Sequence, residues 1–430
     1  MHFQPVVDQI VRAHPLDPLY AIVFAIALAV VALSTARRPA LGFCALVATV
    51  PFALYCDVFG TTVTLPKVAL LGVLLGLTAH RDRIGSLAFR PARGLLYGAA
   101  AVFLALAISI VQAGSHAAAV REVLKLVEYI LAFLAAYACY RLDPDEGYAR
   151  AAIALTVVAV SIGAIAQEFG GAPSGMWFNN VVIPRIAGAL EGPNQLAGYL
   201  EIGIALLGAF ACARPRLDIV CALGVAAFAL VLTFSRSGII GAGVAVAVIA
   251  VVYRRAALAM LAPVGIAALA GIGVAGIWAE TAHTAASNLL RISTGSALAA
   301  TGYSGGVGSR SELWHAAFAL WKRHPIFGVG AGNFELDLPQ VGLTGVRTHA
   351  NSLYLQALVE GGLPLFAATV YFVSVSIASF VRRAAASPLV AGALAASIAL
   401  ALHQIFDYLI FYPKVGEMWW LVLALGAACL

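Results

Sequence analysis

The sequence predicts an all-α polytopic membrane protein, and two observations lead to this prediction. Of the 430 residues, 62% are hydrophobic and only 11% are charged, whereas a soluble domain carries about 25% charged residues. Apolar runs of roughly 15 to 25 residues recur along nearly the whole chain, which is the length that a helix needs to cross a bilayer. A soluble fold could not bury so many helices that are apolar on every side.

Taken in order, the apolar runs predict about 12 to 13 transmembrane helices. The expected spans are 19–35, 40–56, 64–79, 94–113, 122–140, 150–167, 194–212, 217–234, 238–253, 256–278, 352–380, 386–405 and 416–430. The run from Leu19 leads to Arg37 and Arg38, which anchor a helix, so we expect no cleaved leader. We expect N-terminal scaffold helices at 1–180, a core at 181–380 and C-terminal helices at 381–430.

The arginines of the short loops predict the orientation of the chain. Alternating the spans brings all these loops to one face, which the positive-inside rule makes cytoplasmic. The loops carry Arg37, Arg38, Arg81, Arg83, Arg90, Arg93, Arg141, Arg150, Arg214, Arg216, Arg254, Arg255, Arg382 and Arg383. Because the net charge of +6 is spread in this way, it does not indicate nucleic-acid binding. The opposite face receives two long intervals, 168–193 and about 280–350, whose basic residues suggest an anionic ligand.

The stretch 347–351 closes the longest polar interval and precedes a hydrophobic helix. A helix that begins near Thr348 would place His349 in its first turn, where the positive end of the helix dipole lowers a histidine pKa. A neutral imidazole at pH 7 can act as a general base. The alternative is an interfacial histidine that caps a membrane helix. Glu360, three turns further on, is expected to pair with another helix, because a carboxylate at that depth must be paired or protonated.

Two arginines lie where helices are expected to begin. Arg236 stands between two apolar runs with almost no loop, and an arginine so close to hydrocarbon indicates function unless it snorkels to the interface. Arg310 precedes an amphipathic helix expected to start at Ser311 as N-cap and to run to about Arg323. The Arg310 guanidinium and the free N–H groups of that helix could face one anion, or Arg310 could be a solvated loop residue.

A third group of polar residues, Arg185, Glu191 and Asn194, flanks the start of the span at 194–212. Proline and glycine nearby suggest an irregular segment that lines a cavity, with an ordinary surface loop as the alternative. The sequence has no phosphate-binding loop of the nucleotidases, no His-Glu-x-x-His motif and no paired acidic residues on an outer loop. Arginines rather than a metal ion would therefore have to neutralise a bound diphosphate.

Four stretches, in order, resemble the O-antigen ligase and Wzy-like polymerase superfamily of bacterial membrane glycosyltransferases. They lie at 191–197, 235–238, 309–334 and 349–362, and the resemblance covers about residues 180–380. The resemblance implies a GT-C-like fold in the bacterial inner membrane, an active site that faces the periplasm in a long loop, and no metal, nucleotide or other cofactor. It also implies two arginines that hold an undecaprenyl diphosphate, matched here by Arg236 and Arg310, and a histidine base, matched by His349.

The sequence and the resemblance together predict a metal-independent glycosyltransferase of the O-antigen ligase type. It would move a glycan from an undecaprenyl-diphosphate carrier to a sugar hydroxyl of lipid A-core. Arg236, Arg310 and Arg185 would neutralise the diphosphate, and His349 would take the proton of the acceptor. Substrate binding or orientation would involve Asn351, Thr348, Arg347, Glu191 and Asn194. Many members of the superfamily have a second histidine where this chain has Asn351, so a displaced base is an alternative.

Two other functions remain open at this point. A Wzy-like polymerase would use the same residues and transfer the glycan to a carrier-linked glycan acceptor. A lipid-glycan or solute transporter belongs to another class and would show inverted repeats and paired charges along a path. Charges inside or beside the apolar runs leave room for it: Lys67, Lys125, Glu128, Glu201 and Asp407. Lys125 lies three residues from both Glu122 and Glu128, and this spacing predicts ion pairs within one helix. Paired structural roles are the simpler expectation for the isolated residues Lys67, Glu201 and Asp407.

Overall fold

The computed structural model describes residues 18–52, 54–58, 61–169, 176–178, 181–183, 185–282, 310–346 and 348–430. It confirms the predicted all-α class, because every expected span corresponds to a helix. These helices are α2 (Pro18–Arg37), α3 (Pro39–Thr49), α4 (Leu65–Leu77), α6 (Arg93–Ser109), α7 (His116–Leu142), α8 (Glu146–Phe169), α9 (Pro193–Ala213), α10 (Leu217–Leu232), α11 (Arg236–Tyr253), α12 (Leu258–Ala282), α17 (Leu353–Val381), α18 (Pro388–His403) and α19 (Pro413–Ala428).

Short elements connect these helices. The α-helical pieces are α5 (Arg81–Gly85), α15 (Arg310–Arg323) and α16 (Phe334–Asp337), and 3-10 turns include η3 (Ile110–Gln112) and η8 (Leu409–Phe411). Two antiparallel hairpins pair β1 (Tyr55–Val58) with β2 (Thr61–Thr64) and β3 (Met176–Phe178) with β4 (Val181–Ile183). The span expected at 40–56 was too long: α3 ends at Thr49, just before Pro51, which cannot continue the helical hydrogen bonds.

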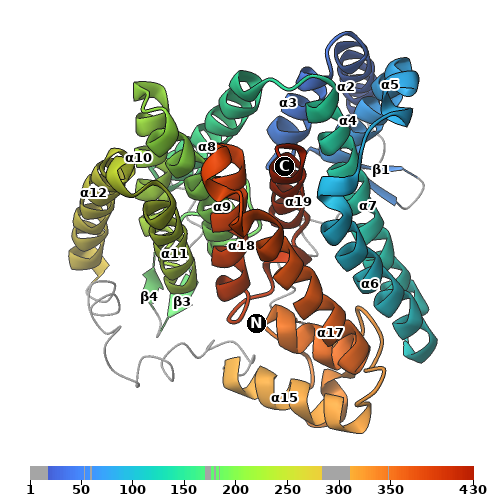
Figure 1. Cartoon of the computed structure of the whole chain (residues 1–430). Coiled ribbons are helices and arrows are strands. Elements are labelled where there is room, and N and C mark those ends of the chain that lie inside the picture. Colours follow the sequence, from blue (N-terminus) through green and yellow to red (C-terminus); the bar gives the residue numbers. More distant parts are fainter. Residues whose placement is uncertain are drawn as a thin grey trace.

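Six helical segments of the described chain are long and apolar enough to cross a membrane: Arg90–Gln112, His116–Leu142, Glu146–Gln167, Pro193–Ala213, Arg236–Tyr253 and Leu353–Val381. Shorter apolar helices accompany them, among them α10 and α18. The chain is therefore a multi-pass membrane protein. The bundle brings together helices that are far apart in sequence, with α9 and α18 at its centre and α6, α7 and α17 at one side (Figure 1).

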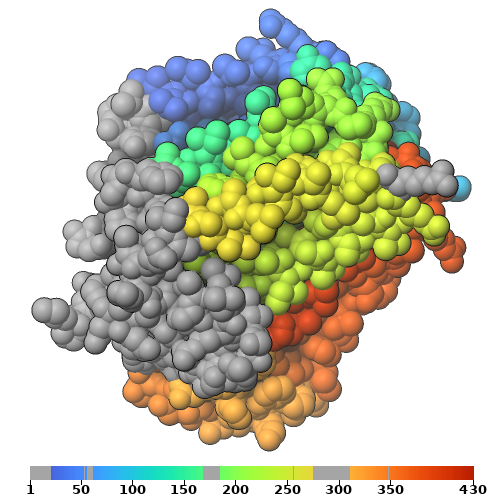
Figure 2. All heavy atoms as spheres, turned by 90° about the vertical axis from the view of Figure 1, so that its left-hand side faces the viewer, coloured from blue at the N-terminus to red at the C-terminus, as the bar shows by residue number. Residues whose placement is uncertain are grey.

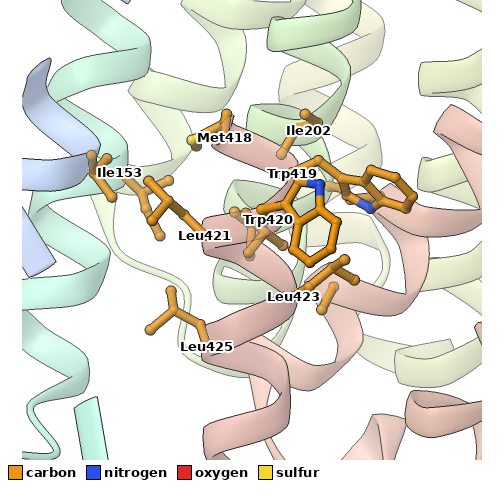
Figure 3. Close-up of a cluster of buried hydrophobic side chains, with 14 of the residues drawn as sticks. Ile153, Ile202, Met418, Trp419, Trp420, Leu421, Leu423 and Leu425 are labelled. Carbon is orange, nitrogen blue, oxygen red and sulfur yellow. The ribbon is translucent and has the colours of Figure 1, made fainter. Parts of the chain in front are cut away.

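Helix α9 forms the centre of the core. It is buried along nearly its whole length and packs against α8, α10, α11 and α18. Helix α19 packs against α7, α9 and α18, and its bulky side chains, including Trp419 and Trp420, lie in the same buried cluster as Ile153 and Ile202 (Figure 3). Trp420 also stacks on Phe372 of α17 with ring centroids 4.9 Å apart. On the side of the molecule seen in Figure 2, α12 (yellow) lies over α10.

A cap of short elements covers one end of the bundle. Helix α15 lies across this end and contacts α17 (Figure 1). The loop that follows α15 comes so close to α17 that a side chain at Gly328 would collide with the backbone of Glu360, and Gly328 has a positive φ of 68°. The neighbouring Val329 N–H donates to the Val359 carbonyl at 2.9 Å. The cap is thus fixed to α17 by backbone contacts that only glycine permits.

Candidate active site

His349 lies in the loop before α17 and is mostly buried. Helix α17 begins at Leu353, with Ser352 as the N-cap whose Oγ accepts from Leu355 N–H at 3.4 Å. The prediction that His349 lies in the first helical turn is therefore wrong. Burial lowers the pKa of His349 below its usual value, Asp407 opposes this shift, and Arg310 adds to it. A lowered pKa of His349 was predicted, but its cause is desolvation rather than the helix dipole, and it favours the neutral imidazole.

The hydrogen bonds of His349 fix its tautomer. The backbone N–H of Asn351 donates to His349 Nδ1 at 3.2 Å, and Nε2 lies 3.1 Å from the Tyr412 hydroxyl oxygen. Because a peptide N–H can only donate, Nδ1 must accept and the neutral ring carries its proton on Nε2, which donates to Tyr412. The rings of Tyr408, Phe411 and Tyr412 surround the imidazole, with centroids 5.7, 5.5 and 5.8 Å away.

Asn351 orients the imidazole through its backbone rather than through its side chain. Its φ is 48°, in the left-handed region that asparagine enters more readily than other residues with side chains. This conformation aims its N–H at the preceding histidine. Thr348 is partly buried and makes no side-chain hydrogen bond with the described part of the chain. Arg347, also expected to bind or orient substrate, lies outside the described residues.

Asp407 is the centre of the polar network beside His349. Its side chain is only 3% exposed, and its Oδ2 lies 3.8 Å from Arg310 Nη2. The same oxygen accepts from Asn194 Nδ2 at 2.9 Å, while Oδ1 accepts from Tyr408 N–H at 2.8 Å. Charged and neutral donors thus surround the carboxylate, which is how proteins compensate a buried charge.

Arg185 continues this network. Its Nη2 donates to Asn194 Oδ1 at 2.9 Å, and its Nε donates to the Thr233 carbonyl at 2.6 Å. The chain of contacts Arg185–Asn194–Asp407–Arg310 therefore joins three segments that are remote in sequence, at 185–194, 310 and 407. Three of the predicted site residues meet here. Asp407 joins them, but the sequence predicted it only as a paired structural charge. Its position just after an apolar helix could have marked it as a candidate site residue.

Arg236 is the first residue of α11, and it lies three residues after Thr233, whose carbonyl accepts a hydrogen bond from Arg185. Ser235 caps the helix, with its Oγ accepting from Gly238 N–H at 3.4 Å. Within the described part of the chain, the guanidinium of Arg236 makes no hydrogen bond or ion pair. An unengaged cation at a helix N-terminus is suited to an anionic ligand.

Arg310 and Glu191 differ from their predicted settings. Helix α15 starts at Arg310, so Ser311 lies inside its first turn rather than at the N-cap. The Arg310 side chain remains 41% exposed although it pairs with Asp407, so an anion in solvent can reach it. Glu191 pairs with Lys414 at 3.3 Å, and Lys414 also donates to the Ala189 carbonyl. Lys414 is a further cation that sequence reasoning did not single out.

The loop of His349 is fixed to α17 by two buried side chains. The Ala350 N–H donates to Gln356 Oε1 at 2.7 Å, and Gln356 Nε2 donates to Glu360 Oε1 at 2.9 Å. Glu360 Oε1 also accepts from the Phe334 N–H at 3.3 Å. Glu360 was expected to be a buried partner for another helix, and the helix it contacts is the short α16 of the cap, through the backbone N–H of Phe334, in addition to Gln356 of its own helix.

Several other charges of the apolar helices are paired. Lys125 binds Glu122 at 2.8 Å, as the spacing predicted, but Glu128 pairs with Lys67 at 3.8 Å instead. Glu201 pairs with His403 at 2.8 Å. Lys125 also lies 4.5 Å from the ring centre of Phe411, beside His349. These pairs agree with the structural roles expected for Lys67 and Glu201.

Within the described residues, no group of three or more histidine, cysteine, aspartate or glutamate side chains could hold a metal ion. The chemical resources of the site are a neutral imidazole, a buried carboxylate and several guanidinium groups. This combination suits the binding of an anion beside a group that can take up a proton.

Comparison with known families agrees with this geometry. Residues 221–370 match the family model described as O-Antigen ligase. No curated protein matches the chain. The matched segment contains Arg236, Arg310 and His349, whereas Arg185 and Asp407 lie outside it. The resemblance inferred from the sequence is confirmed for this segment. Residues 221–370 of this multi-pass membrane protein thus resemble the O-antigen ligase family, whose enzymes act as ligases or polymerases in polysaccharide biosynthesis.

Proposed function

We propose that the chain is a glycosyltransferase that moves a glycan from an undecaprenyl-diphosphate carrier to a sugar hydroxyl of lipid A-core. The observation that carries the proposal is the meeting of the Arg185–Asn194–Asp407–Arg310 network with a neutral His349. The match to the O-antigen ligase family supports the same class of reaction. The core of the enzyme would be residues 181–380, which include the matched segment.

The charges of the site support a diphosphate as ligand. Arg185, Arg236 and Arg310 contribute three positive charges, and Asp407 removes one. The remaining charge would balance the two ionised oxygens of a diphosphate diester. Arginine forms bidentate hydrogen bonds with phosphate oxygens, and these bonds strengthen when negative charge develops on the leaving group.

The kink in α17 supports a site at the level of lipid headgroups. Residue Gly362 has non-helical dihedral angles, φ 62° and ψ −155°, so residues 363–381 form a separate helical piece. At 1.5 Å per residue this piece is about 28 Å long, close to the hydrocarbon core of about 30 Å. Arg382 and Arg383 follow it at the end that the positive-inside rule makes cytoplasmic. His349 then lies beyond the opposite, periplasmic boundary of the inner membrane.

The proton transfer requires that the hydrogen bond from Asn351 N–H to His349 Nδ1 breaks. The acceptor hydroxyl would replace the Asn351 N–H at Nδ1, because this nitrogen already holds the lone pair of the neutral ring. As the hydroxyl oxygen bonds to the anomeric carbon, its proton passes to Nδ1. The bond from that carbon to the diphosphate oxygen breaks, and the electron pair leaves with the diphosphate. The Nε2–H would keep its hydrogen bond to the Tyr412 hydroxyl, and this bond keeps the imidazolium oriented.

A transfer assay tests the proposal directly. Purified protein would be given a glycan on undecaprenyl diphosphate, with EDTA present, and either lipid A-core or a second carrier-linked glycan as acceptor. We expect transfer to lipid A-core by the wild type, and loss of transfer in His349→Ala and Arg310→Ala. Transfer only to the carrier-linked glycan would identify a Wzy-like polymerase. No transfer to either acceptor would contradict the proposal and favour a lipid-glycan or solute transporter, and loss of transfer with EDTA alone would contradict metal independence.

A further inference from the structure

A histidine and a glutamate are paired in the interior of the helical bundle. His403 Nδ1 lies 2.8 Å from Glu201 Oε2, and both side chains are fully buried. Glu201 Oε1 and His403 Nε2 find no hydrogen-bond partner within the described residues. Burying two such groups is costly, and apolar residues of the same volume often give equal or greater stability. Stability alone therefore does not account for this pair.

The pair touches three helices, each of which carries a candidate site residue at one end. Glu201 lies two turns after Asn194 on the same face of α9. His403 ends α18, one turn's length before Asp407. From the third side, α11 approaches through Gly241, where a Cβ atom would lie 2.6 Å from Glu201 Cδ. Gly241 comes little more than one turn after Arg236, the first residue of α11.

The segment after His403 transmits this placement to the rest of the site. The carbonyl of Gln404 accepts from Leu353 N–H at 2.9 Å, where α17 begins beside the loop of His349. The side-chain Oε1 of Gln404 accepts from Ile410 N–H at 3.3 Å. A shift of His403 would therefore reach both the start of α17 and the segment that ends with Tyr412.

We propose that Glu201 and His403 are positioning residues for the transfer reaction. The pair holds α9, α11 and α18 in one register, so that Asn194, Arg236 and Asp407 face the same diphosphate. The reaction assigned to them rests on the function proposed above, whereas the geometry rests only on the contacts of the pair. A short hydrogen bond between two side chains is directional and holds one relative placement, whereas apolar packing tolerates small sliding movements.

Two glycines of α11 provide a matched test. Gly241→Ala would push a methyl group against the Glu201 carboxylate, while Gly243→Ala, on the same helix, would project into open space. Both changes favour helix formation to the same degree. We expect kcat to fall at least tenfold in Gly241→Ala, with KM for the acceptor unchanged, and to stay within twofold of wild type in Gly243→Ala. Equal effects of the two changes, or normal kcat in a folded Gly241→Ala protein, would overturn the proposal.

A second measurement does not depend on activity. Hydrogen–deuterium exchange would be followed in residues 233–238 and 404–412 for Glu201→Gln, His403→Gln, Gly241→Ala and Gly243→Ala. We expect faster exchange in both segments for the first three variants, and no change for Gly243→Ala. Unchanged exchange in variants that retain the wild-type elution volume would overturn the positioning role. If the wild type transfers no glycan, the proposed function fails, but this measurement still decides whether the pair holds the three helices.

A double-mutant cycle separates positioning from general stabilisation. If Glu201 acts through Arg236, then Glu201→Gln should reduce kcat much less in an Arg236→Lys background than in the wild type. If the pair merely stabilises the fold, the two reductions should multiply, because distant independent sites have additive effects on free energy. Multiplying effects on kcat would therefore count against the proposal.

Discussion

Replacing Asp407 by asparagine tests the central network most directly. The change keeps the shape of the side chain but removes its charge and one acceptor oxygen. In the wild type, Asn194 Nδ2 at 2.9 Å and Tyr408 N–H at 2.8 Å use different oxygens of the carboxylate. Asparagine offers one oxygen and one NH₂ group, so at least one of these buried donors would face another donor.

The size of the effect follows from these contacts. A hydrogen bond to a charged group contributes about 1.5–3 kcal/mol, and an unsatisfied buried donor costs about 1–3 kcal/mol. The Arg310 pair, at 3.8 Å with the guanidinium 41% exposed, adds only about 0–1 kcal/mol because solvent screens it. We therefore expect Asp407→Asn to lower the free energy of unfolding by about 2–4 kcal/mol.

The kinetic constants should separate two opposing effects of this change. Misplacement of Arg310 and Asn194 should lower kcat by ten- to a hundredfold, which corresponds to about 1.4–2.8 kcal/mol of transition-state stabilisation. The KM for the diphosphate donor should not rise, because loss of a nearby negative charge strengthens the attraction of the arginines for an anion. Ground-state attraction and transition-state alignment would thus change in opposite directions.

Steady-state transfer kinetics and a melting curve in detergent would measure both quantities. Asp337→Asn is the matched control, because within the described residues the Asp337 carboxylate accepts a side-chain hydrogen bond only from Gln340 Nε2, at 2.7 Å and exposed. We expect this control to change stability by less than about 0.5 kcal/mol and to leave kcat unaltered. An Asp407→Asn protein with wild-type stability and kcat would refute the role of Asp407 in this network.

Three further predictions concern His349 and its partners. Burial lowers the pKa of His349, and only the neutral ring can accept a proton. The kcat should therefore stay level near pH 7 and fall only below about pH 6.5. A fall that begins above this pH would contradict the role of His349 as the base. Tyr412→Phe removes the hydroxyl that lies against Nε2–H of His349. It should lower kcat about tenfold at unchanged KM, which corresponds to a rise of about 1.4 kcal/mol in the activation free energy. An unaltered kcat would exclude a role of Tyr412 in orienting His349. Asn351 has a φ of 48°, which alanine adopts less readily than asparagine or glycine. Asn351→Ala should therefore lower the free energy of unfolding by about 1 kcal/mol in thermal melts, while Asn351→Gly should not. Equal melting temperatures of the two variants would argue against the left-handed conformation.

The helices were predictable because their cause is local. A run of apolar residues must satisfy its backbone hydrogen bonds internally in a bilayer, and this requirement holds whatever the rest of the chain does. The span expected at 40–56 was too long, because Pro51 ends the helical hydrogen bonds and α3 stops at Thr49. The start of α17 was placed too early because Ser352, rather than Thr348, caps the helix.

The site was predictable in part. Arg185, Asn194 and Arg310 could be singled out because polar residues at the ends of apolar helices have few structural uses, and the structure brings them together. The role of His349 as the base remains a prediction. Its lowered pKa was anticipated, but from a helix dipole that the structure does not place there.

By itself, the sequence determined the class of the protein, the positions of its helices and the kinds of side chain that gather at their ends. Only the tertiary structure decided which of these side chains meet. Asp407 binds Asn194, and Glu201 binds His403, across more than two hundred residues of chain. No local pattern encodes such pairs, because they depend on how α9, α11 and α18 pack around a common centre, and packing is a property of the whole bundle.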